Sequence, residues 1–385
     1  MSKYIFIISS RRLQERDHER FGVKYLSKKK KVIILDLSNL LMNRSTLIYK
    51  KIKLSYIKEI KSYKDLISIL KNKENSFALD YTGNSITEIV IKLILVWSNI
   101  KLIKYSGGLK PGDLYNHIDK NNKIFKTDQR SVFKKFFDLP FFFFRLIKKI
   151  ILDFINFCSV DTVMIAGKKS VEENNYIYAK KRKLYTHSYN YNHFLALDKK
   201  KIKIKKKDYI VYVDQGLLTH PDFFIKKREP LVDKNFYIKI NNFLSFIEKK
   251  YKYQIKIALH PKNNKMNNLF PKRYICYLDK TAELIKDSKH VLIHYSTAVS
   301  FGVLFKKPIT FLTSDKLNNF RPGAQITKLS HELKSHLINI DKNKKKIRLQ
   351  MKFNKKAYNM YLDKYIKHPK STGENSFKYL LRNIY

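Results

Sequence analysis

The chain has 385 residues, 44% of them hydrophobic, and its 80 Lys and Arg against 32 Asp and Glu give a formal charge of +48. This length predicts two domains, because one core rarely grows beyond about 250–300 residues. Abundant Ile, Leu, Phe and Tyr exclude a largely disordered chain, and only 10 Gly and 9 Pro exclude collagen-like and Pro-rich classes. The two cysteines, Cys158 and Cys276, form no CxxC pair, so we expect a reducing compartment.

The positive charge has more than one interpretation. An excess of this size attracts nucleic acid or anionic lipid. Lys, Asn, Ile and Tyr are also abundant together, as the codons of an AT-rich genome produce, and the charge is spread along the chain. Because RNP-type and helix-turn-helix signatures are absent, we expect no nucleic-acid partner. An anionic membrane surface stays open as the alternative to codon bias.

Apolar segments of the sequence are short. The start, MSKYIFIISS, is apolar only at residues 4–8 and lacks the charged region and cleavage site of a signal peptide. The longest apolar stretches, residues 89–97 and 139–144, fall short of the ~20 residues that span a bilayer. We therefore expect a cytoplasmic location, with peripheral attachment to the inner face of the cytoplasmic membrane as an option.

The N-terminal part of the chain alternates between strand and helix patterns. Residues 31–37, KVIILDL, form an apolar run of the kind that is buried on both faces of a parallel sheet. The same alternation predicts strands at residues 4–8, 77–80 and 100–105 and helices at residues 11–27 and 85–97. This rhythm indicates βαβ units and an α/β fold.

The segment after Pro140 has a different pattern. Apolar side chains recur at helical spacing on one side and polar ones on the other, namely Phe143, Ile147, Ile150, Phe154 and Phe157 against Arg145, Lys149, Asp153 and Asn156. Such an amphipathic helix either packs on the first sheet or rests on anionic lipid with its Phe side chains inserted. The sequence leaves both arrangements open.

Residues 199–207, KKKIKIKKK, mark the sharpest change of composition, and we place a domain boundary just before them. A second alternating series follows, with strands at residues 209–213, 254–259, 291–294 and 309–312 and helices at residues 235–250, 281–287 and 297–305. The sequence thus predicts an α/β protein with two Rossmann-like domains, at residues 1–195 and 196–340, and a helical C-terminal tail at residues 341–385.

Three polar loops directly follow strands of the second domain. They are Asp214-Gln215-Gly216 after YIVYV, His260-Pro261-Lys262 after IKIAL, and His294-Tyr295-Ser296-Thr297 after VLI. Open α/β sheets bind ligands at the carboxyl ends of their strands, so we expect these loops to form one site. Each loop alone is compatible with an ordinary turn, strand exit or helix cap, but their coincidence at three strand ends favours a functional site.

The residue types indicate how such a site would work. Asp214 is suited to act as a general base toward a hydroxyl, and Gly216 lets a substrate approach. His260 can donate a hydrogen bond or a proton to a phosphate. Ser296 is expected to cap a helix whose N-terminus attracts anions. His220, in a second His-Pro, is a candidate for positioning an acceptor or orienting Asp214.

Metal and cofactor motifs are absent from the sequence. No Asp-x-Asp, GxxxxGK[ST], GxGxxG, HExxH or GxSxG occurs. His187 and His193 have no cluster of Cys or carboxylate residues nearby in the sequence. We therefore expect an enzyme that uses neither a cofactor nor a metal.

These motifs resemble those of bacterial sialyltransferases and polysialyltransferases of the two-domain GT-B type. The families share an acidic pair followed by Gly, a His-Pro and a downstream Ser-Ser/Thr, which correspond to Asp214-Gln215-Gly216, His260-Pro261 and Ser296-Thr297. The resemblance covers about residues 208–315, and Gln215 replaces the second acidic residue. The longer pattern over residues 186–312 is similar to uncharacterised surface-polysaccharide glycosyltransferases of low-GC bacteria.

The resemblance implies roles for the domains and residues. The first domain would receive the acceptor and the second would bind the nucleotide sugar. Asp214 would be the general base, His260 a phosphate partner or general acid, and Ser296 and Thr297 phosphate ligands. We add three further substrate-binding candidates from the same loops, Gly216, Lys262 and His294.

The activity that this implies is a metal-independent inverting glycosyl transfer. A nonulosonic acid such as sialic acid would move from a CMP-sugar to a lipopolysaccharide, capsule or other surface glycan. Two alternatives stay open: a surface-polysaccharide glycosyltransferase with another nucleotide sugar, and a non-catalytic basic protein that binds nucleic acid or a membrane.

Overall fold

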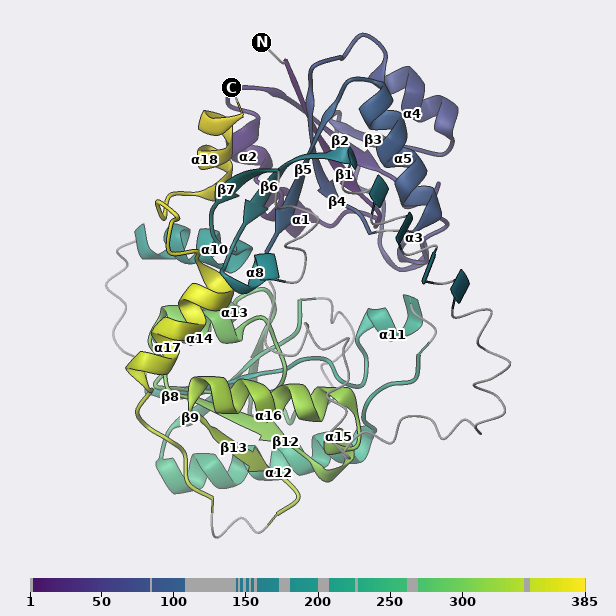
Figure 1. Cartoon of the computed structure of the whole chain (residues 1–385). Helices are drawn as coiled ribbons and strands as arrows, with labels where there is room; N and C mark the ends of the chain where they lie inside the picture. The colour runs from purple at the N-terminus through teal and green to yellow at the C-terminus, as the bar shows by residue number, and fades with distance from the viewer. Residues whose placement is uncertain are drawn as a thin grey trace. The chain divides into compact units, whose positions relative to one another are not determined.

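The structure is a computed structural model, and it describes residues 3–83, 85–107, 158–172, 181–199, 208–225, 228–261, 269–342 and 347–384, with single residues and pairs between 143 and 155. The described residues divide into two compact units, one from residues 1–107, 126–187 and 369–385 and the other from residues 188–368. Each unit contains a parallel sheet with helices on both faces (Figure 1). The predicted α/β class with two Rossmann-like domains is confirmed.

The first unit contains a seven-stranded sheet with the order β3-β2-β1-β4-β5-β6-β7. Its strands all run parallel, and they are β1 (Tyr4–Ser9), β2 (Lys31–Asp36), β3 (Ile57–Glu59), β4 (Phe77–Tyr81), β5 (Lys101–Ser106), β6 (Val160–Ile165) and β7 (Arg182–Tyr185). The strands predicted from sequence correspond to β1, β2, β4 and β5. The others lack a clear apolar run, since β3 and β7 have only 3 and 4 residues and Asp161-Thr162 interrupts β6.

The helices of the first unit are mostly short. They are α1 (Glu15–Arg20), α2 (Val23–Leu26), α3 (Ser45–Ile48), α4 (Tyr63–Leu70), α5 (Ile86–Trp97), α8 (Lys169–Glu172) and α18 (Ser376–Asn383). The prediction of one helix at residues 11–27 is wrong, because Gly22 adopts a left-handed conformation with φ of 66° and separates α1 from α2.

Both faces of the first sheet are covered by apolar side chains. On one face α4 and α5 contribute Leu66, Leu70, Ile91 and Leu95. On the other face α2 and α18 contribute Val23, Leu26, Phe377, Leu380 and Leu381. This two-sided burial explains why β1 and β2 are apolar along nearly their whole length.

Helix α18 comes from the far end of the chain. The tail expected at residues 341–385 is helical in part, but its elements belong to different units: α17 (Lys355–Tyr361) and the π-helical turn Leu362–Ile366 to the second, α18 to the first. Asn375 caps α18 by accepting hydrogen bonds from the N–H groups of Phe377 and Lys378. The buried apolar side of α18 accounts for this division, because it completes the first core.

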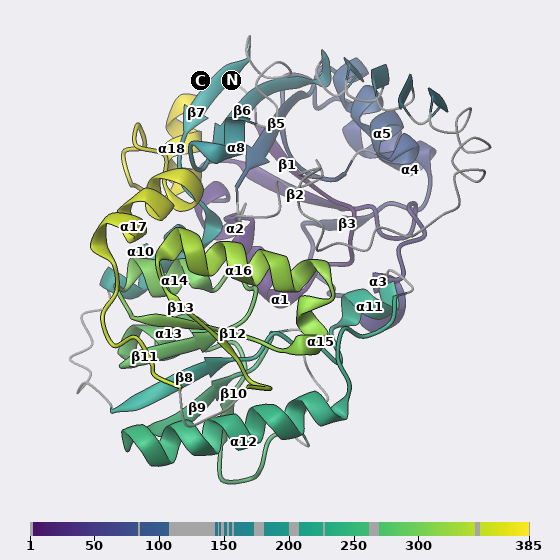
Figure 2. The ribbon, with the colours of Figure 1, turned by 60° about the horizontal axis from the view of Figure 1, so that its bottom comes forward.

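The second unit contains a six-stranded sheet with the order β10-β9-β8-β11-β12-β13. Its parallel strands are β8 (Tyr209–Val213), β9 (Gln254–Ala258), β10 (Ile275–Tyr277), β11 (His290–Ile293), β12 (Ile309–Thr313) and β13 (His336–Asn339). Its helices are α10 (Tyr189–Lys199), α11 (Pro221–Ile225), α12 (Lys234–Tyr251), α13 (Thr281–Asp287), α14 (Val299–Leu304), α15 (Asp315–Asn318) and α16 (Arg321–Leu333). Figure 2 shows α12 along one face of this sheet and α13, α14 and α16 on the other.

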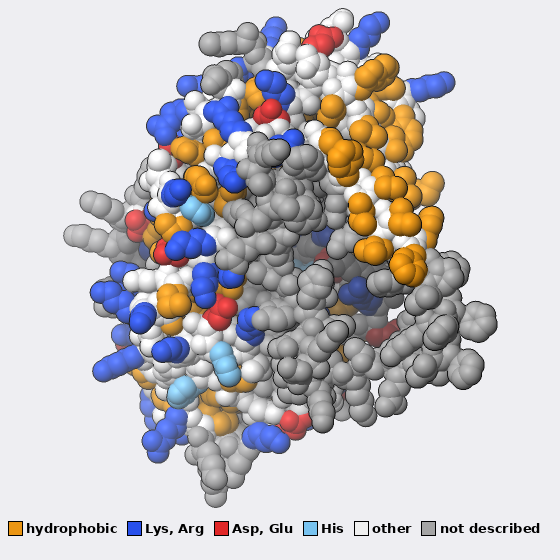
Figure 3. Space-filling model, viewed as in Figure 1, with side chains coloured by type: hydrophobic (Ala, Val, Ile, Leu, Met, Phe, Trp, Pro, Cys, Tyr) orange, Lys and Arg blue, Asp and Glu red, His pale blue; other side chains and the backbone are white. Residues whose placement is uncertain are grey.

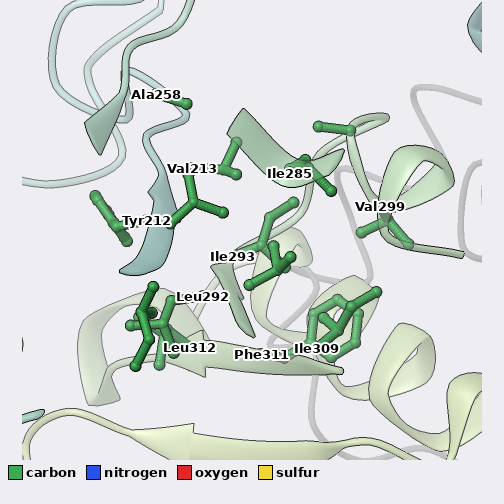
Figure 4. Packing of buried hydrophobic residues seen from close by; sticks show 14 of the residues in the cluster. Tyr212, Val213, Ala258, Ile285, Leu292, Ile293, Val299, Ile309, Phe311 and Leu312 are labelled. Carbon is green, nitrogen blue, oxygen red and sulfur yellow. The ribbon is translucent and has the colours of Figure 1, made fainter. Parts of the chain in front are cut away.

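The three central strands form the core of the second unit. Every residue of β8, β11 and β12 is buried, and Figure 4 shows Val213, Ile293 and Phe311 packed with their neighbours. The sequence-based boundary at residues 195/196 lies inside α10, which packs in this unit with the Phe194 ring centroid 5.2 Å from that of Phe305. The chain therefore passes from one unit to the other a few residues earlier, between residues 187 and 188.

Gly22 and Phe377 should be energetically coupled. A Cβ atom at Gly22 would overlap the Phe377 ring, in addition to the strain of a left-handed φ. We expect Phe377→Ala to lower the free energy of unfolding by about 3–5 kcal/mol, and Gly22→Ala to lower it separately. The double variant should lose less than the sum of the two, because removal of the ring makes room for the methyl group. Urea denaturation measures the cycle, with Gly22→Ala plus Leu66→Ala, on the opposite face, as the additive control.

Two buried histidines should make the chain less stable in acid. Burial lowers the pKa of His290 to about 3 and that of His294 to about 4, against 6.5 for the free side chain. Below about pH 6.5 the unfolded chain binds protons that the folded chain does not take up, so the free energy of unfolding falls as pH approaches 4. In denaturant titrations, His290→Gln and His294→Gln should flatten this dependence and His331→Gln, at an exposed position, should not. An unchanged slope in both buried-site variants would contradict the assignment.

Candidate functional site

The loops after β8 and β11 meet at the point where the strand order of the second sheet reverses. β8 and β11 are direct neighbours, paired from His290 with Ile210 to Ile293 with Val213, although five of the described elements lie between them in the sequence. The Gln215 side-chain amide donates a hydrogen bond to the Tyr295 carbonyl and so joins the two loops. β9 pairs with the other edge of β8, which brings its own loop beside them. In Rossmann-like sheets this switch point is where ligands bind.

Asp214 lies deep in this edge. Its side chain is only 3% exposed, and its carboxylate accepts a 3.0 Å hydrogen bond from the Tyr237 hydroxyl on α12. Burial, together with the neighbouring carboxylate, raises the pKa of Tyr237, so this tyrosine stays protonated and continues to donate. The contact ties the end of β8 to α12. Asp214 is therefore held firmly but offers little surface to a substrate.

His260 and His220 form a pair that the sequence did not reveal. Their ring centroids are 4.4 Å apart, and both rings are partly exposed. The Asp222 N–H donates to His220 Nδ1 over 3.0 Å, which places the proton of a neutral His220 on Nε2. Gly216, with φ of 62°, allows the tight turn that leads to this pair, and its carbonyl accepts the His220 N–H. Two imidazoles side by side at a strand end can bind phosphate and transfer protons.

Ser296 and Thr297 lie at the same edge but do not cap a long helix. α14 begins at Val299, not at residue 297, and its N-cap position is Ala298. The Ser296 hydroxyl oxygen instead accepts the Ala298 N–H over 3.2 Å, within a turn that precedes the helix. Ser296 is partly exposed and Thr297 exposed, so both side chains are accessible to a ligand. The expected N-cap is thus wrong, because the chain makes a turn before it enters α14.

His294 is part of the core. It is 1% exposed, its Nε2 lies 3.0 Å from the Tyr212 hydroxyl, and its Nδ1 lies 2.7 Å from the Leu312 carbonyl. Both ring nitrogens are therefore occupied by groups of the second unit, and the ring stays neutral. The structure assigns His294 to packing, in contrast to its expected contact with substrate. Lys262, another predicted binding residue, lies outside the described residues.

A cavity of about 380 Å³ lies near the same edge, between the start of α12 and the ends of β12 and β13. It is lined by Asp233, Asn235, Phe236, Ile238, Lys239, Ser314, Lys316 and Asp341. Its charges are paired, with Lys316 2.8 Å from Asp233 and Lys239 2.7 Å from Asp341. Within the described residues, no group of three His, Cys, Asp or Glu side chains is arranged to hold a metal ion.

The first unit carries polar groups that the sequence analysis did not single out. Asp36 is the last residue of β2, and Asp80 is the last but one of β4. Each carboxylate accepts a hydrogen bond from the backbone N–H two residues later, from Ser38 at 2.9 Å and from Thr82 at 2.8 Å. A buried aspartate followed two residues later by Ser or Thr is visible in both sequences, KVIILDLS and FALDYT. The partly exposed Lys104 lies 3.2 Å from Asp80. These groups fix the loops at the carboxyl edge of the first sheet.

Comparison with known proteins supports the fold. No protein-family model matches the chain, and no curated protein matches it. Among solved structures, the wall teichoic acid polymerase TagF aligns with 100% of this chain and 88% of its own, at 13% identity and a TM-score of 0.53, and a histidine variant of it reaches 0.55.

A second similar structure is MnaA of S. aureus, solved with UDP. The alignment covers 99% of this chain and 97% of the MnaA chain, with 14% identity and a TM-score of 0.50. At these identities the likeness concerns the fold alone. The chain thus has the two-unit Rossmann-like fold that TagF and MnaA also have, along its whole length.

Proposed function

We propose that the chain is a glycosyltransferase that takes a sugar from a nucleotide and contributes to a surface polysaccharide. The observation that carries this proposal is the gathering of Gly216, His260, Ser296 and Thr297 beside the switch point of the second sheet, where such sheets bind nucleotides. The names of two fold neighbours agree with it: MnaA was solved with UDP, and TagF is a wall teichoic acid polymerase.

For the donor we propose a CMP-linked nonulosonic acid, and the sequence resemblance is what supports it. The fold neighbours favour other nucleotides, because MnaA was solved with UDP and a TagF variant was soaked with CDPG. A UDP- or CDP-linked donor is therefore the second candidate. We assign the glycan acceptor to the first unit, where Lys104 and Arg12 provide partly exposed cations for an anionic group.

The reaction we propose is a single displacement. The acceptor hydroxyl attacks the anomeric carbon, its C–O bond forms as the bond to the nucleotide phosphate breaks, and the configuration inverts. A base takes the hydroxyl proton, and a hydrogen-bond donor stabilises the leaving phosphate. His260 is the preferred residue for this chemistry, since its imidazole is partly exposed and lies against His220.

Asp214 is reassigned within this proposal from general base to positioning residue. A base must come within hydrogen-bond distance of the hydroxyl that it deprotonates, and Asp214 is 3% exposed with Tyr237 as a donor. Its contact holds the end of β8, from which the loop to His220 departs. Ser296 and Thr297 keep their expected role as ligands of the donor phosphate.

The donor nucleotide should be identifiable by thermal shift. We expect CMP to raise the melting temperature more than UDP, CDP or GDP, because a ligand that binds the native state stabilises it by mass action. The shift should persist in EDTA and shrink in Ser296→Ala. A larger shift with UDP or CDP would replace the CMP donor and leave the glycosyltransferase proposal in place, whereas no shift with any nucleotide would contradict the proposed function itself.

His260→Ala should lower turnover by about 10²–10⁴, the usual contribution of a positioned acid or base. The matched control, His331→Ala, removes an exposed histidine in the last turn of α16 and should leave turnover unchanged. Asp214→Asn should lower turnover less than about tenfold and reduce the melting temperature, as expected for a positioning residue. The measurement is release of free nucleotide from the identified donor. A hundredfold loss in Asp214→Asn with an unchanged melting temperature would return the base role to Asp214.

A further inference from the structure

Helix α5 presents apolar side chains to solvent and buries its charges. Lys92 is fully buried, 3.2 Å from Asp80, and Glu88 is buried in the capping box of the helix. On the outer side Ile86, Leu93 and Trp97 are 57%, 45% and 82% exposed. This inverts the usual pattern of a surface helix, in which charged residues face water.

The helix after Pro140 presents a second apolar surface in the same unit. Its described residues between 143 and 155 are helical. The apolar side chains among them that are more than half exposed are Phe143, Phe144, Ile147, Ile150, Ile151 and Phe154, at 52–67%. Of the two arrangements that the sequence left open, packing of this face on the sheet is therefore wrong, because the side chains that would pack point to solvent.

The two surfaces adjoin. Figures 1 and 2 both show the described pieces between residues 143 and 155 running alongside α5, and Figure 3 shows apolar side chains gathered in this region of the surface. We call this region the apolar face and define it by Ile86, Leu93, Trp97, Phe144, Ile150 and Phe154. Soluble monomers rarely expose this many large apolar side chains in one contiguous patch, and such patches commonly mark interaction sites.

A basic border lies next to the apolar face. α5 runs back to the amino edge of the first sheet, and exposed cations lie at the starts of four strands there. Lys3 directly precedes β1, and β2, β5 and β7 begin with Lys31, Lys101 and Arg182. Lys28 and Lys29 precede β2 and are also exposed. Trp97 lies four residues before Lys101, so the apolar face and this border meet at the end of α5. Exposed carboxylates near this edge, Glu74 and Asp161, are outnumbered.

We propose that the apolar face and its basic border dock on an anionic membrane surface. Phe and Trp side chains suit the interface between headgroups and acyl chains, and flanking lysines gain energy from anionic lipid. A second copy of the chain is a poorer occupant, because two molecules with a formal charge of +48 each repel one another. Among the described residues no helix has the length and apolarity to cross a bilayer. The proposed contact therefore has the apolar face lying on the bilayer surface.

The test uses Trp97, which is the single tryptophan of the chain. Its emission reports on the apolar face without any added label. We expect a shift to shorter wavelength when the full chain is mixed with vesicles of equal parts phosphatidylcholine and phosphatidylglycerol. Pure phosphatidylcholine should give little shift, and high salt should weaken binding because it screens the basic border. A shift that depends on protein concentration without lipid would instead indicate self-association and overturn the proposal.

Three variants distinguish the parts of the surface. By vesicle co-sedimentation, Ile150→Glu with Phe154→Glu should weaken binding by about tenfold or more, since apolar burial is lost. Lys31→Glu with Lys101→Glu should weaken it by at least about fivefold for each cation removed. Met360→Glu, at a 48% exposed apolar position on α17, is the matched control and should bind like the wild type. Far-UV circular dichroism verifies folding. Equal binding of the wild type to both vesicle types, or unchanged binding in both double variants, would overturn the proposal.

Discussion

The parallel arrangement of every strand in the second sheet is the constraint from which the candidate site follows. Parallel pairing puts all carboxyl ends at one edge, and the reversal of order between β8 and β11 sends the helices that follow them, α12 and α14, to opposite faces of the sheet (Figure 2). The backbone of this edge is held by buried strands, so the loops start from fixed points. The bond from Gln215 to the Tyr295 carbonyl then links the two loops that border the switch point.

Depth within this edge separates structural from accessible groups. Asp214, Tyr212, Tyr237 and His294 are all nearly or fully buried, and their hydrogen bonds connect β8, β11 and α12. His220, His260, Ser296 and Thr297 remain at least partly exposed. A polar residue at a strand end can thus belong to either class. The class depends on whether the side chain packs inside the unit, as Asp214 does against Tyr237 of α12, or reaches solvent from the loop.

The sequence predicted what local patterns determine. β8 is five consecutive apolar or aromatic residues between two aspartates, and its bounds are as predicted. α12 begins at Lys234, directly after its N-cap Asp233 and one residue before the expected start. The pairing of His220 with His260 depends on how two separate loops fold back on each other, which no local pattern encodes. Likewise, the spacing of Phe143, Ile147 and Ile150 indicates a shared helix face but not what covers it.

The position of α18 has a consequence for biosynthesis. The described core of the second unit comes from one continuous stretch of chain, so it can form while translation continues. The first unit cannot complete its core in the same way, because Phe377, Leu380 and Leu381 emerge from the ribosome long after β1 and β2. The half of the protein that is synthesised first is therefore finished last, and until α18 is made, the sheet face that it covers lacks that part of its cover.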